Sequence, residues 1–120
     1  MTSLELVKKI AGILDQKKGM DIQAIKVRDL TIVADYFVIA GATSTTHVKS
    51  LADEVEYQLK QEDIYPARIE GYGSASWVLI DYGEVIVHIF NPEAREFYKL
   101  ERLWADGEQV SLDELGIGEA

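Results

Sequence analysis

Three side chains with useful chemistry interrupt a stretch that is otherwise almost entirely aliphatic, residues 77–90. They are the indole of Trp77, the carboxylate of Asp81 and the imidazole of His88. Two runs rich in β-branched residues flank an Asp-Tyr-Gly sequence, a pattern typical of a β-hairpin inside a sheet. Because side chains alternate along a strand, Trp77 and Asp81 share one face and Val78 lies on the other. The pattern predicts a sheet face with a task besides packing.

The sequence allows two registers for this hairpin. A two-residue loop of Tyr82 and Gly83 would pair Trp77 with His88, whereas a three-residue loop at 81–83 would pair it with Val87. Trp77 fits an ordinary core position and an interface position equally well. His88 is interpreted first as a hydrogen-bonded sheet histidine rather than as a ligand.

Nucleotidyl transfer would need two or three carboxylates that converge on a divalent metal. A strand with the pattern Asp-x-Asp usually supplies them, and this sequence has none. Glu54 and Glu56 have the spacing but belong to a predicted helix, where side chains two positions apart diverge. An active nucleotidyltransferase would have to combine Ser44 with carboxylates from distant segments, such as Asp35 and Asp81. This stays the alternative function.

Residues 41–44 (Gly-Ala-Thr-Ser) lie between a predicted buried strand and a helix, where free N–H groups can hold a phosphate. The same residues suit a turn with an N-cap, and the glycine spacing and lysine of a phosphate loop are missing. The two histidines, His47 and His88, show no spacing that demands a shared metal, and the chain has no cysteine. The sequence predicts neither a cofactor nor a metal site.

The charge balance restricts the partners. Lys and Arg number 12 against 21 Asp and Glu, which gives a net charge of −9. Cations supply most of the affinity for phosphate backbones, so we expect a basic protein partner and no direct contact with nucleic acid. The start lacks a signal segment and no apolar run approaches membrane length. These observations predict a soluble, cytoplasmic protein without a membrane partner.

Hydrophobic periodicity predicts a single α/β domain, a mixed β-sheet with flanking helices. The run at 36–40 is apolar on both faces and should be central in the sheet. Pro66 limits 65–70 to a weak or edge strand. The domain should span residues 1–106, and the acidic tail 107–120 should be loosely ordered. We expect helices at about 2–18, 44–61 and 93–98, an extension of the last one towards Trp104 being open, and strands at about 22–27, 36–40, 65–70 and 77–90.

Several blocks, taken together in order and spacing, resemble the ribosomal silencing factor (Iojap) family over about residues 4–104. The blocks are Asp35-Tyr36-Phe37-Val38-Ile39 followed by Ser44, Glu70-Gly71, Trp77-Val78-Leu79-Ile80-Asp81-Tyr82-Gly83, Val87-His88-Ile89-Phe90, and Arg95-x-Phe97-Tyr98-x-Leu100-Glu101-x-Leu103-Trp104. The resemblance implies a nucleotidyltransferase-like fold without catalytic carboxylates, and thus a protein that is not an enzyme.

The resemblance also implies a partner and an action. Members bind the large ribosomal subunit through its uL-fourteen class protein, block joining of the small subunit and repress translation when nutrients are short. They are linked to large-subunit biogenesis and often form homodimers. The candidate contacts are Trp77 as the anchor, then Asp81, Glu70 and Tyr82 facing the cations of the partner, with His88, Arg95 and Tyr98 as further contacts or as supports of the sheet.

Overall fold

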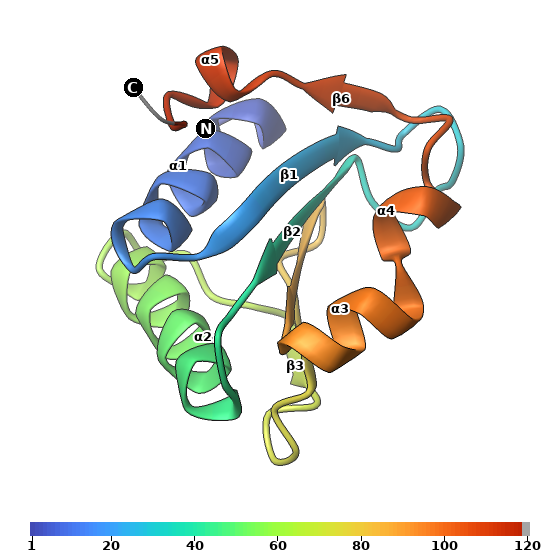
Figure 1. The fold of residues 1–120 in the computed structure, drawn as a ribbon. Coiled ribbons are helices and arrows are strands. Elements are labelled where there is room, and N and C mark those ends of the chain that lie inside the picture. The colour runs from blue at the N-terminus through green and yellow to red at the C-terminus, as the bar shows by residue number, and fades with distance from the viewer. Residues whose placement is uncertain (119–120) are drawn as a thin grey trace.

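The computed structural model describes residues 1–118 and shows a six-stranded mixed sheet with helices on both faces (Figure 1). The strand order is β3-β4-β5-β2-β1-β6; β2 and β5 run parallel, and the other neighbours are antiparallel. The predicted α/β class is confirmed. The strands are β1 (Met20–Lys26), β2 (Tyr36–Gly41), β3 (Arg68–Glu70), β4 (Trp77–Asp81), β5 (Val85–Phe90) and β6 (Glu108–Val110); the helices are α1 (Ser3–Gln16), α2 (Thr45–Lys60), α3 (Pro92–Tyr98), α4 (Leu100–Leu103) and α5 (Leu112–Leu115).

Local caps explain where the two long helices begin. The Thr2 hydroxyl accepts the N–H of Glu5, and the Glu5 carboxylate accepts the N–H of Thr2 at 2.7 Å, so two otherwise unpaired donors are satisfied. The Ser44 hydroxyl accepts the N–H of His47 at 3.1 Å. The cap interpretation of residues 41–44 is therefore confirmed.

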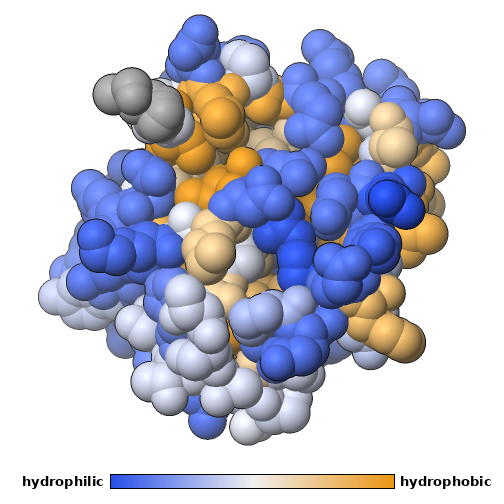
Figure 2. Space-filling model, in the orientation of Figure 1, coloured by the Kyte–Doolittle hydropathy of each residue, from blue (hydrophilic) through white to orange (hydrophobic). Residues whose placement is uncertain are grey.

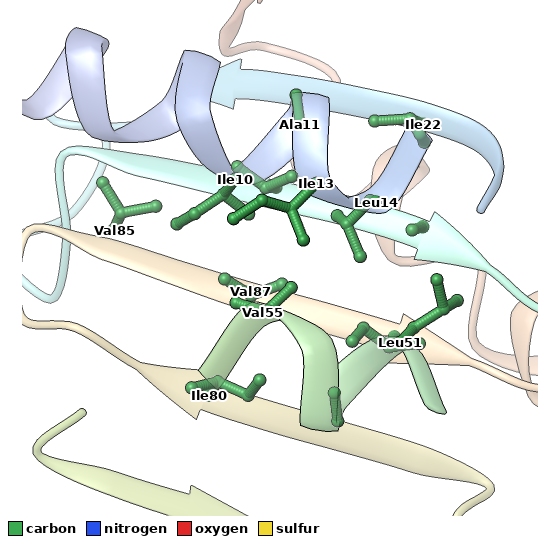
Figure 3. Packing of buried hydrophobic residues seen from close by; sticks show 14 of the residues in the cluster. Ile10, Ala11, Ile13, Leu14, Ile22, Leu51, Val55, Ile80, Val85 and Val87 are labelled. Carbon is green, nitrogen blue, oxygen red and sulfur yellow. The ribbon is translucent and has the colours of Figure 1, made fainter. Parts of the chain in front are cut away.

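The main core lies between the sheet and the pair α1 and α2, with side chains from both helices meeting those of the strands (Figure 3). Val78, Ile80 and Val87 point into it and are fully buried. Burying a side chain of this size stabilises the fold by about 1.5–3 kcal/mol. Because Val78 and Ile80 occupy this face, Trp77 and Asp81 share the opposite one, as the alternation predicts.

A second, smaller core lies on the opposite face of the sheet, under α3 and α4 (Figure 1). All six residues of β2 are buried, because helices cover both of its faces, and the predicted central position is confirmed. The helix predicted at 93–98 does not continue unbroken. Lys99 adopts a left-handed conformation with φ of 47°, and α4 starts again at Leu100, whose side chain fills the second core.

The hairpin register is neither of the two predicted ones. The N–H of Tyr82 donates to the Val85 carbonyl at 2.9 Å, which leaves Gly83 and Glu84 as the loop. Gly83 takes the positive φ of 87° that this tight turn requires, and its N–H donates to the Asp81 carboxylate at 2.7 Å. This bond holds Asp81 in the strand before the loop. In consequence Trp77 lies opposite Phe90, and Leu79 lies opposite His88.

The prediction of a loosely ordered tail is wrong for residues 107–118. Residues 108–110 form β6, which pairs with β1, and Leu115 of α5 is only 4% exposed in the main core. Acidic composition pointed to a solvated tail, but backbone pairing along β1 docks the segment, together with the buried Leu115 and with Val110 and Ile117 packed against the main core. Residues 119–120 lie outside the described residues.

Candidate protein-binding surface

The helices α3 and α4 cover the second face of the sheet over β2 and β5 but leave its β3–β4 end accessible (Figure 1). Side chains that alternate on this face come together by cross-strand pairing of Arg68 with Asp81 and of Glu70 with Leu79. A cavity of about 240 Å³ opens there, lined by residues 70, 71, 77 and 79. We call this set the β3–β4 surface: Arg68, Glu70, Trp77, Leu79 and Asp81.

Trp77 lies at the border between this surface and the second core. Its ring packs 5.0 Å from Phe90 and 4.7 Å from Tyr98, measured between ring centroids. Its indole N–H donates to His88 Nδ1 at 3.1 Å. Trp77 is half-buried. The ring is thus held in a defined position while part of it stays available to a partner, an arrangement between the two readings that the sequence left open.

His88 supports Trp77 and does not itself form part of the surface, since it is 4% exposed. Burial lowers the pKa of its imidazole to about 4. Its Nδ1 accepts the indole N–H, so Nε2 carries the proton in the neutral ring. No protein acceptor for this Nε2 proton occurs among residues 1–118. The prediction of His88 as a direct contact is therefore corrected: the buried imidazole supports the Trp77 ring.

The two carboxylates predicted to meet a basic partner both lie on this surface. Asp81 is 18% exposed and Glu70 is 55% exposed, by side chain. Between them lies the guanidinium of Arg68, whose Nη1 is 2.8 Å from Glu70 Oε2 and whose Nε is 3.3 Å from Asp81 Oδ2. Sequence reasoning missed Arg68, although its place two residues before Glu70 on a predicted strand puts both on one face.

Two predicted contacts, Tyr82 and Arg95, do not lie on the β3–β4 surface. Tyr82 packs against the main core on the other side of the sheet, and burial raises the pKa of its hydroxyl. Arg95 is 12% exposed, donates to the Asp21 carbonyl at 2.9 Å and pairs with Glu101 at 3.4 Å. It therefore ties α3 to β1 and α4, the supporting role among its two predicted ones.

Tyr98 extends the surface, since it is 45% exposed and lies beside Trp77. Phe97 is 79% exposed and Leu103 is 74% exposed, so α3 and α4 add apolar area that sequence reasoning did not assign. Figure 2 shows hydrophobic side chains on the side where Figure 1 places α4 and the loop before β2. That loop contributes Ile32, which is fully exposed.

The serine of the alternative function, Ser44, lies far from its proposed carboxylate Asp35. Asp35 precedes β2 and Ser44 follows it, so the strand separates them by about 20 Å. Asp35 instead accepts the Ser3 hydroxyl at 2.9 Å. Across residues 1–118, no group of three or more His, Cys, Asp or Glu side chains is placed to hold a metal ion. None of the helices in the same range combines the length and hydrophobicity needed to cross a membrane.

The fold has close structural relatives. A crystal structure of a protein from Chromobacterium violaceum superposes with a TM-score of 0.85 at 33% identity, and the match covers 100% of this chain and 97% of that one. A crystal structure from Bacillus halodurans gives a TM-score of 0.80 at 34% identity, covering 90% of this chain and 98% of the other.

The names of the sequence relatives refer to the ribosome. The chain is 36% identical over 113 residues to the ribosomal silencing factor RsfS of Bacillus subtilis, covering 94% of this chain and 96% of that one. It is 34% identical over 99 residues to the mouse protein named mitochondrial assembly of ribosomal large subunit protein 1, of which it covers 43%. The family model described as "ribosomal silencing factor during starvation" matches residues 1–119. The chain therefore belongs to the RsfS family of ribosomal silencing factors.

Proposed function

We propose that this protein binds the large ribosomal subunit, keeps the small subunit from joining it and so represses translation under nutrient limitation. The observation that carries the proposal is the family match over residues 1–119. The mouse relative, which is named for assembly of the large ribosomal subunit, supports that subunit as the target and a further role in its biogenesis.

The contact that we propose is between the β3–β4 surface and a basic ribosomal protein of the uL-fourteen class. Trp77 and Leu79 supply an apolar centre, and aromatic side chains held in this way dominate interface energy. Asp81 and Glu70 flank that centre and match a basic partner, as the net charge of −9 does. Tyr98 and Phe97 enlarge the area towards the roughly 800 Å² per partner of a stable complex.

The proposed action is steric and involves no chemical step. A domain seated on the face of the large subunit that meets the small subunit leaves no room for joining. We place this action in the cytoplasm, where subunits join. Homodimer formation, which the family resemblance implies, stays a prediction.

The test mixes purified small and large subunits with and without the protein and separates the products by sedimentation. We expect the protein to travel with large subunits and not with small ones, and to lower the fraction of joined ribosomes. Asp81→Asn should weaken this effect, whereas Asp15→Asn, the same charge change at an exposed position of α1, should not. Joined particles at unchanged yield with the protein bound would contradict steric silencing. Diphosphate release from nucleoside triphosphates and magnesium would instead support the nucleotidyltransferase alternative.

A further inference from the structure

Arg68 places a positive charge in the middle of the acidic side chains of the β3–β4 surface. Its guanidinium reaches Glu70 Oε2 at 2.8 Å and Asp81 Oδ2 at 3.3 Å. The two carboxylates that the proposed function assigns to a basic partner are therefore already paired within the chain. A cation of the partner that approaches Asp81 Oδ2 from the side of β3 meets Arg68 Nε, 3.3 Å from that oxygen.

The pairing with Arg68 is easily exchanged. The side chain of Arg68 is 57% exposed and that of Glu70 is 55% exposed, and ion pairs this accessible are weak because water and salt compete with them. Arg68 lies on β3, which is an edge strand, so its flexible stem can turn into solvent while its backbone stays paired.

Asp81 stays in place when Arg68 leaves. Its Oδ1 accepts the Gly83 N–H at 2.7 Å, a bond made within the hairpin and independent of Arg68. Only Oδ2 faces the guanidinium. Removal of Arg68 would thus expose a carboxylate oxygen that is already oriented and needs no ordering on binding.

We propose that Arg68 occupies in the free protein the position that a lysine or arginine of the partner takes in the complex, and that this residue sets how strong a cationic contact must be to bind. The inference rests on the proposed function and concerns the same surface. A partner that offers only apolar contacts leaves Arg68 paired with Glu70 and Asp81, so these carboxylates remain unavailable to it. A partner with a well-placed cation replaces it, so Arg68 favours basic surfaces over merely hydrophobic ones.

The experiment compares Arg68→Gln with Lys8→Gln in binding to isolated large subunits. Both changes remove one positive charge, but Lys8 is exposed on α1 and forms no ion pair within residues 1–118. Arg68→Gln should tighten binding by about two- to fivefold, since the partner no longer displaces an exposed ion pair. Lys8→Gln should tighten it less. Urea titration of each variant confirms that both remain folded.

A second comparison locates the effect. With both carboxylates neutralised by Glu70→Gln and Asp81→Asn, Arg68→Gln should no longer tighten binding, because nothing remains for Arg68 to block. Equal or weaker binding of Arg68→Gln than of the unaltered protein overturns the inference while the proposed function stands. An equal gain in Lys8→Gln also overturns it, because net charge alone would then act. If the unaltered protein does not bind large subunits, both the proposed function and this inference fail.

Discussion

Replacing His88 with glutamine should flatten the pH dependence of folding stability in mildly acidic solution. His88 lies on β5 and is 4% exposed, and this burial lowers the pKa of its imidazole to about 4. In the unfolded chain the same group titrates near pH 6.5. The native site also resists protonation, because Nδ1 accepts the indole N–H of Trp77 and would face that donor with a second proton.

The sign and size follow from linkage. Between the two pKa values the unfolded chain binds a proton that the native protein excludes, so the free energy of unfolding falls as pH falls. From about pH 7 to pH 5 the loss due to His88 is about 2 kcal/mol. Above the unfolded pKa the group is neutral in both states and costs nothing.

The assay is urea unfolding at several pH values in this range, followed by far-ultraviolet circular dichroism, because tryptophan fluorescence would also report the change beside Trp77. The quantity of interest is the difference in slope between the unaltered protein and His88→Gln, since all other titrating groups are common to both. The unaltered protein should lose about 2 kcal/mol more between pH 7 and pH 5. Identical slopes would refute the reasoning, because His88 would then accept a proton in the native state.

Trp77→Ala should weaken binding to large subunits by about 2 kcal/mol or more, while Val78→Ala, fully buried on the other face, should cost about 2 kcal/mol of folding stability and leave binding by the folded protein unchanged. Ribosome sedimentation together with urea titration separates the two, and the reverse outcome would put the partner surface on the other face. Binding should weaken as salt rises, chiefly through slower association. Salt-independent binding would argue against Asp81 and Glu70 as contacts to a basic partner. Leu115→Ala should lower the free energy of unfolding by about 2–3 kcal/mol, whereas a tail that does not contribute to the core would give no change in the urea midpoint.

Local patterns in the sequence were enough to predict most helices and strands and to assign the hairpin side chains to the two faces of the sheet. The helical spacing of apolar residues, the caps at Thr2 and Ser44, and the doubly apolar run of β2 all act over a few residues. The strict alternation of a strand likewise put Trp77 and Asp81 on one face, whatever the register. Such features depend on neighbours along the chain, which the sequence displays directly.

Which residues together form the β3–β4 surface could be determined only from the tertiary structure. Arg68 reaches Asp81 because β3 pairs with β4, and this pairing brings together residues from two separate segments. Tyr82 continues the alternation of β4 by pairing with Val85, so its side chain lies on the main-core face with Val78 and Ile80 and not with Asp81. A shift in register reassigns every cross-strand neighbour, so no single-residue pattern reveals it.

The same reason explains the tail. β6 pairs with β1 across more than 80 residues of chain, and Leu115 is buried only because α1 and the sheet already form the main core. In the sequence, the most evident property of residues 108–115 is their acidity, and this property concerns only the side chains that stay in water. Whether its backbone finds an unpaired strand edge is decided by the strands that are present elsewhere. The sequence thus specified which segments form helices and strands and which side they bury, while the tertiary structure decided which of them meet, because pairing depends on groups that are distant in the chain.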